Sequence, residues 1–136
     1  MKEDFEKYLK YHCNKGGTGK MFNFKFIEYK NGILKLEGEF GDSTLNPNKT
    51  VQGGQMTSML DDATSLLLIY ESNGKVYPNS TNLTSLHHRP LYKGKVIVTA
   101  EMIQKGKNIA TIKGALYNSE NKIAATLMHT AFLFNV

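Results

Sequence analysis

One segment near the middle of the chain, residues 46–68, reads NPNKTVQGGQMTSMLDDATSLLL and combines two features that a stable helix does not need. Its helical periodicity begins with Gly53 and Gly54, although a glycine within a helix costs about 1 kcal/mol relative to alanine. It also carries Asp61 and Asp62 among apolar residues, where a carboxylate is unfavourable unless something pairs with it. Two departures from local preference in one segment are typical of a functional site.

The glycine pair lies where a loop is expected to become a helix, so its N–H groups are among the four that have no acceptor within the helix. Together with the positive end of the helix dipole, such donors can bind a carbonyl oxygen or an oxyanion. Because glycine has no side chain, a ligand can approach this backbone closely. Taken alone, a glycine pair is more simply explained by a tight loop or by close helix–strand packing.

The aspartates belong to a polar stripe on the predicted helix, which in isolation is most simply a solvent-facing side. Asp61 follows Gly53 by eight residues, which is roughly 12 Å along a helix axis. One helix cannot bring this carboxylate to a carbonyl group held at its own N-terminus, whereas two antiparallel copies can. The spacing therefore favours a site shared across a dimer. The stripe comprises Gln55, Thr57, Ser58, Asp61, Asp62, Thr64 and Ser65.

Hydrophobic periodicity predicts the elements that must position these residues. An amphipathic helix is expected near 2–13, and Asn31-Gly32 is a strong signal for a hairpin turn. The central helix starts at the glycine pair and has a stop signal at Gly74. Strands are expected at 21–30, 33–40, 79–88, 94–104, 109–117 and 122–134.

This order of elements predicts the fold class. A central helix that is apolar around much of its circumference must be wrapped by a sheet. We therefore expect a single α+β domain over residues 1–136, with a curved antiparallel sheet of five to six strands around one long central helix. Residues 1–20 form an N-terminal helix and loop in this prediction. The edges of such a sheet favour pairing with a second copy of the chain.

Composition limits the function classes. The 136 residues include 40% hydrophobic and 21% charged residues, as in an ordinary globular domain, and no apolar run is long enough to span a membrane. The start of the chain lacks the apolar stretch of a signal peptide, and a single cysteine allows no internal disulfide, so the cytoplasm is the expected compartment. The net charge is +5, but the lysines are scattered singly, so neither a nucleic-acid nor a membrane partner is expected.

The sequence NPNKTVQGGQMTSMLDDA resembles the motif of hotdog-fold acyl-CoA thioesterases of the phenylacetate-degradation (PaaI-like) type. That motif commonly reads Asn-Pro-x-Gly-Thr-Val, then His or Gln, then Gly-Gly, with an acidic residue nine positions after the His or Gln. Gln52 and Asp61 have this spacing. The stretches STNLTSLHHRPLYKGKV and IQKGKNIATIKGALYNSENKIAATLMHTAFLF resemble the strands that follow. The chain departs from the common pattern at Gln52, where many members have His, and at Lys49, where Gly is common.

The resemblance implies an acyl-CoA substrate, a homodimer or homotetramer with shared sites, and no metal or other cofactor. It implies that an N–H group of Gly53 or Gly54 polarises the thioester carbonyl. Gln52 cannot take up a proton as a histidine would, but its side chain can form a hydrogen bond with the thioester. Asp61 of the opposite subunit would act as general base or nucleophile, and Asn46 would orient water or substrate.

The resemblance also implies a set of substrate-binding residues. The side chains expected to line the pocket are those of Thr57, Ser80 and Thr81. Arg89, with Lys93 and other lysines, would hold the phosphates of coenzyme A. A solvated basic edge explains Arg89 equally well, and it explains any single lysine better. His87 and His88 are adjacent in a predicted strand and face opposite sides, so no metal site is expected there.

Two further functions stay open at this stage. The departures at Gln52 and Lys49 are compatible with a catalytically silent hotdog module that binds acyl-CoA or a related ligand. A basic domain that binds nucleic acid is supported by net charge alone. A dehydratase of the same fold is disfavoured, because no histidine lies near the start of the central helix.

Overall fold

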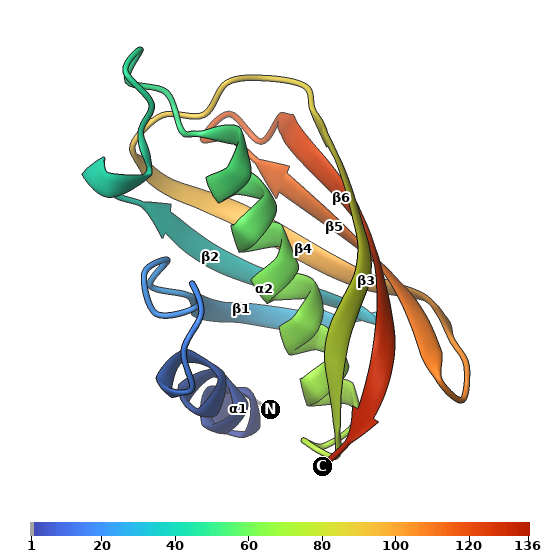
Figure 1. Ribbon diagram of the computed structural model, residues 1–136. Coiled ribbons are helices and arrows are strands. Elements are labelled where there is room, and N and C mark those ends of the chain that lie inside the picture. The colour runs from blue at the N-terminus through green and yellow to red at the C-terminus, as the bar shows by residue number, and fades with distance from the viewer. Residues whose placement is uncertain (1) are drawn as a thin grey trace.

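The computed structural model describes residues 2–136, in which a curved antiparallel sheet wraps around one long helix (Figure 1). The helix α2 spans Gly53–Glu71, and a shorter helix α1 (Lys2–Asn14) packs against it and against β1. A 3-10 turn, η1, covers Asp42–Thr44. The sheet has the order β1-β2-β4-β5-β6-β3, with β1 at Lys25–Lys30, β2 at Ile33–Phe40, β3 at Val76–His87, β4 at Gly94–Lys105, β5 at Ile109–Tyr117 and β6 at Ile123–Asn135. The predicted α+β architecture is confirmed.

The first hairpin shows how local sequence sets the sheet register. Asn31 and Gly32 both have positive φ, at 54° and 77°, as a two-residue turn with the twist of the flanking strands requires. The preceding strand is shorter than predicted and begins at Lys25 rather than near residue 21. Asn23, with φ 48°, interrupts the extended backbone there. Phe22 and Phe24 nevertheless point into the core, as their alternation indicated.

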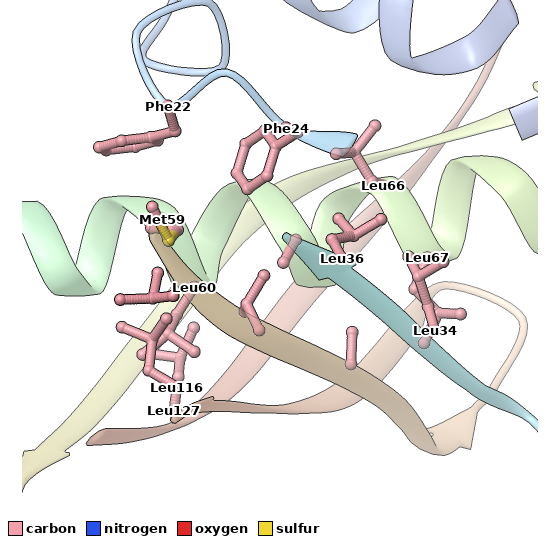
Figure 2. Close-up of a cluster of buried hydrophobic side chains, with 14 of the residues drawn as sticks. Phe22, Phe24, Leu34, Leu36, Met59, Leu60, Leu66, Leu67, Leu116 and Leu127 are labelled. Atoms are coloured by element: carbon pink, nitrogen blue, oxygen red, sulfur yellow. The ribbon is translucent and has the colours of Figure 1, made fainter. Parts of the chain in front are cut away.

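The core lies between α2 and the concave face of the sheet (Figure 2). Leu60 on α2 meets Leu116 of β5 and Leu127 of β6, and all three side chains are buried. Gly114 on β5 allows this close approach, because a Cβ atom there would lie 3.1 Å from Leu60 Cδ2. On the other side of the helix, the two phenylalanines of the segment before β1 close the core.

The end of α2 follows the predicted stop signal. The N–H group of Gly74 donates to the carbonyl of Ile69 at 2.8 Å, and its φ of 77° turns the chain toward β3. β3 then runs antiparallel to β6 along its whole length and forms one edge of the described sheet. Neither described helix is long and apolar enough to cross a membrane.

Candidate active site

The first half of the candidate site is the N-terminus of α2. Gln52 is the last extended residue, with φ −60° and ψ 136°, and its carbonyl accepts hydrogen bonds from the N–H groups of Gln55 and Met56 at 2.9 and 3.2 Å. The N–H groups of Gly53 and Gly54 precede these bonds and have no acceptor within the helix. A carbonyl oxygen approaching along the helix axis would meet these two donors and the positive end of the helix dipole.

The loop before α2 is held by Asn46. Its Oδ1 atom accepts hydrogen bonds from the N–H groups of Asn48 and Thr50 at 2.9 and 3.1 Å, and its Nδ2 atom donates to Thr50 Oγ1 at 2.8 Å. Lys49 has φ 64°, a conformation that glycine adopts without strain. The loop thus keeps a left-handed residue where the PaaI-like motif commonly has glycine. Within this chain Asn46 shapes the loop, and its direct role toward water or substrate stays a prediction.

A shallow pocket of about 340 Å³ opens beside Gly53. His87 lies closest to the glycine, because a Cβ atom at position 53 would be 3.6 Å from its ring. Arg89 also lines the pocket, and its Nη1 atom donates to the carbonyl of Ile123 at 2.6 Å, which ties the segment after β3 to β6. Lys93 is turned toward exposed Asp42, with an ion pair of 3.0 Å. The pocket is lined by Val51, Gly53, Met56, His87, His88, Arg89 and Pro90.

The second half of the candidate site surrounds Asp61, midway along α2. The carboxylate is 37% exposed and accepts a long hydrogen bond of 3.5 Å from Ser65 Oγ. Its Oδ1 atom lies 3.7 Å from Nδ1 of His129, a fully buried residue of β6. The same His129 nitrogen is 2.8 Å from Thr64 Oγ1, and its Nε2 atom is 2.8 Å from Ser80 Oγ on β3. A carboxylate, an imidazole and three hydroxyl groups therefore meet where α2 faces the edge of the sheet.

Burial governs the charge states in this cluster. Burial raises the pKa of Asp61 above its ordinary value of 3.8, and the neighbouring charge of Asp62 adds to this effect. A hydrogen bond from Ser65 acts in the opposite direction, as does His12. Burial lowers the pKa of His129 to about 4, so its ring is neutral at neutral pH. The cluster thus pairs a carboxylate that accepts a proton more readily than usual with an uncharged imidazole.

Asp62 lies on a different side of α2 and does not belong to the same polar surface. Its carboxylate accepts a hydrogen bond of 2.6 Å from Thr18 Oγ1 and lies 2.9 Å from His12 Nε2. The residue is only 8% exposed, because α1 and the following loop cover it. The interpretation of both aspartates as one solvent-facing stripe is therefore wrong, and Asp62 serves to attach the N-terminal segment to α2.

The structure brings some of the predicted site residues together and separates others. Asp61 and Ser80 meet in one cluster, whereas Gly53 and Arg89 share the pocket at the helix N-terminus. Between the two, Thr57 Oγ1 lies 2.9 Å from Ser85 Oγ of β3. Thr81 sits at a bulge of β3 and donates to the carbonyl of Thr130 at 3.1 Å. Among the described residues, no group of three or more His, Cys, Asp or Glu side chains is placed to hold a metal ion.

His129 is the residue that sequence reasoning missed. In β6 the buried side chains alternate, and His129 falls between Leu127 and Ala131 on the inward row. One polar residue in an inward apolar row needs hydrogen-bond partners from an element packed against it. That alternation is visible in the sequence, although the partners are not.

Comparisons with known proteins identify the family and the fold of the chain. Residues 48–125, more than half of the chain, match the model of the thioesterase superfamily. A phenylacetic acid degradation-related protein from Ralstonia eutropha has a similar structure, with a TM-score of 0.79 at 24% identity over 92% of this chain and 98% of that chain. PaaI from Escherichia coli gives 0.81 at 16% identity over 98% and 96% of the two chains.

A third similar structure, from Streptococcus mutans, was determined with acetyl-CoA bound, and it gives a TM-score of 0.74 at 16% identity over 83% of this chain and 90% of that chain. No curated protein sequence matches the chain significantly. The chain belongs to the thioesterase superfamily. The predicted hotdog fold and the class of thioester hydrolase are thereby confirmed.

Proposed function

We propose that the chain hydrolyses acyl-CoA thioesters and that Asp61 activates the attacking water. The observation that carries the proposal is the Asp61 carboxylate itself, which is partly exposed and has a raised pKa beside the Ser80 hydroxyl. A general base works best when its pKa lies closer to the working pH than that of a free aspartate. The acetyl-CoA bound to the similar Streptococcus mutans structure supports this class of substrate.

In this proposal the thioester oxygen binds the N–H group of Gly53 or Gly54. A water molecule attacks the carbonyl carbon while Asp61 accepts its proton, and the negative charge that develops on oxygen is stabilised by the helix N-terminus. The C–S bond then breaks, and the leaving thiolate of coenzyme A takes up the proton held by Asp61, which restores the carboxylate. No redox or metal chemistry is needed for these steps.

The two halves of this machinery belong to different copies of the chain. Gly53 and Asp61 lie on the same helix but eight residues apart, roughly 12 Å along its axis. A thioester carbonyl held at one N-terminus is therefore out of reach of the carboxylate of that same helix. A two-fold related copy brings the N-terminus of one α2 to the Asp61 of the other. The edge position of β3, beside Asp61, supports pairing at this side of the sheet.

The test of the proposed reaction is the release of free thiol from short-chain, medium-chain, long-chain and aromatic acyl-CoAs. We expect turnover with at least one of these classes, and the preferred class identifies the acyl group. A folded oligomer that binds acyl-CoA without turnover would instead favour the non-hydrolytic module.

The shared site makes a separate prediction for mixed oligomers. A chain with Asp61→Asn and a chain with Gly53→Pro are each expected to be inactive, because each lacks one half of every site. A hybrid of the two has one intact site, built from the Gly53 of the first chain and the Asp61 of the second. Random mixing should therefore restore roughly a quarter of the wild-type rate. A mixture of exchanged subunits that stays inactive would show that each chain builds its own site.

A further inference from the structure

His129 has no role in the proposed reaction, yet its ring lies beside the Asp61 carboxylate that activates the water. It is completely buried, and both of its ring nitrogens are within 2.8 Å of a hydroxyl oxygen. Nε2 contacts Ser80, whose hydroxyl stands beside Asp61, and Nδ1 contacts Thr64. A neutral imidazole has one N–H donor and one acceptor nitrogen, so its tautomer decides the direction of both hydrogen bonds.

The surroundings of Nδ1 indicate which tautomer is present. Thr64 Oγ1 lies 2.9 Å from the carbonyl oxygen of Leu60 and 3.1 Å from that of Asp61. Carbonyl oxygens only accept, so the Thr64 hydroxyl donates to them and offers a lone pair to His129. The Asp61 carboxylate, 3.7 Å from Nδ1, also favours a proton on that nitrogen, because an unprotonated nitrogen would direct its lone pair at a negative charge. Both observations place the proton on Nδ1.

With the proton on Nδ1, Nε2 is an acceptor and receives the hydroxyl hydrogen of Ser80. The Ser80 hydroxyl cannot then donate toward the neighbouring Asp61, and its oxygen presents lone pairs to the site. A water molecule has two hydrogens to donate. One can go to the Asp61 carboxylate, which later takes that proton, and the other to Ser80, which leaves the lone pair of the water free to attack.

We propose that neutral His129 is a positioning residue that fixes the Ser80 hydroxyl as a hydrogen-bond acceptor for the water activated by Asp61. The effect of His129 on turnover rests on the proposed function. The tautomer of His129 and the direction of the Ser80 hydroxyl do not, because they are properties of the resting protein. Thr64 completes this chain of hydrogen bonds, because its hydroxyl connects the His129 ring to the backbone of α2.

The order Asp61, His129, Ser80 also resembles a nucleophilic triad, in which serine attacks and histidine takes its proton. Two observations favour positioning instead. The Asp61–His129 distance of 3.7 Å is longer than a hydrogen bond, so the carboxylate does not hold a protonated ring directly. The buried ring, with its pKa of about 4, is also a weak acceptor for a serine proton.

Variants of the chain of bonds test the role in turnover. His129→Leu removes both ring hydrogen bonds, and we expect kcat to fall roughly 10²-fold with little change in KM, as misplacement of a reacting group does. His129→Gln keeps an acceptor near the position of Nε2 and should recover part of the loss. Ser80→Ala should lose about as much as His129→Leu, and the double variant no more than either single one, because both act on one water.

Independent, additive losses from His129 and Ser80 would overturn the proposal, as would an acyl group trapped on Ser80. Thermal unfolding of each variant shows whether a loss of rate comes from a loss of folding. If the wild type hydrolyses no acyl-CoA, it is the proposed function that fails.

The tautomer is measured without any turnover, by two-bond hydrogen–nitrogen correlation spectra of ¹⁵N-histidine-labelled wild-type protein. The His129 signals are assigned by their absence in His129→Gln, which separates them from those of His12, His87 and His88. We expect a proton on Nδ1 and an unprotonated Nε2 throughout the neutral range. A proton on Nε2, or a charged ring at neutral pH, would overturn the proposal whatever the rate assays show.

Discussion

Asp61→Asn is expected to remove most of the thioesterase turnover, by roughly 10²–10⁴-fold, because an amide cannot accept the proton of the attacking water. The substitution keeps the size and shape of the side chain, and Asp61 is partly exposed, so the fold should be unaffected. The measurement is kcat/KM for thiol release from the best acyl-CoA of the panel.

The matched control is Asp62→Asn, the same change at the next residue of α2. Asp62 binds Thr18 and His12 in a buried contact, so its loss should lower the free energy of unfolding and leave turnover far less affected. An equal loss of turnover from both variants, or from neither, would contradict the role given to Asp61.

The raised pKa of Asp61 also fixes the direction of two pH effects. A carboxyl group whose pKa is higher in the folded than in the unfolded protein destabilises the fold above that pKa, because the charged form is disfavoured there. Asp61→Asn should therefore raise the Tm at neutral pH, and the gain should shrink as the pH falls toward 3.8. The acidic limb of wild-type activity should lie above 3.8, since turnover requires the ionised carboxylate. A lower Tm for the variant at neutral pH would contradict this assignment.

Gly53→Pro is expected to lower kcat roughly 10²–10³-fold, the usual effect of removing one donor to a developing oxyanion. Proline deletes a single N–H group and is well tolerated at the first position of a helix. The residue before it, Gln52, already has the extended conformation that proline requires of its predecessor. The measurement is kcat for thiol release, with circular dichroism to confirm that α2 is intact.

Gly53→Ala is the control for this change, since it adds a methyl group but keeps the N–H donor. A Cβ atom there would contact the His87 ring at an ordinary distance of 3.6 Å, so the fold should accommodate it. Alanine should retain most of the turnover that proline removes. Equal losses from both would show that the space beside the backbone matters rather than the donor, and full activity of the proline variant would transfer the role to Gly54.

Much of the fold is predictable because it is encoded locally. The apolar alternation in β2 and β4–β6 and the turn signal of Asn31-Gly32 are properties of neighbouring residues. The same holds for the stop signal at Gly74, which follows the end of α2 at Glu71. The late start of β1 was not predicted, because the alternating phenylalanines continue past the left-handed backbone of Asn23. Phe22 and Phe24 stay buried although the backbone there is not part of a strand.

The environment of the site residues was less predictable, since periodicity gives the face of an element but not what packs against it. The spacing of Asp61 and the glycine pair was visible, and their catalytic roles stay predictions. The partners of Asp62 come from His12 and Thr18, 50 and 44 residues away in sequence. His129 meets Thr64 and Ser80 only because β6 lies between β5 and β3 in the folded sheet. Such long-range contacts follow from topology and not from local pattern.

The contact between Asp62 and the N-terminal segment makes that segment part of the electrostatics of the site. His12 lowers the pKa of Asp61, whereas the charge of Asp62, held in place by His12 and Thr18, raises it. Both partners lie before residue 48, where the match to the thioesterase superfamily begins. Relatives that share the central helix but have a different N-terminal segment need not lose activity at the same acidic pH. Exchanging the first 20 residues between relatives could therefore retune the working pH of such an enzyme while every residue that touches substrate stays the same.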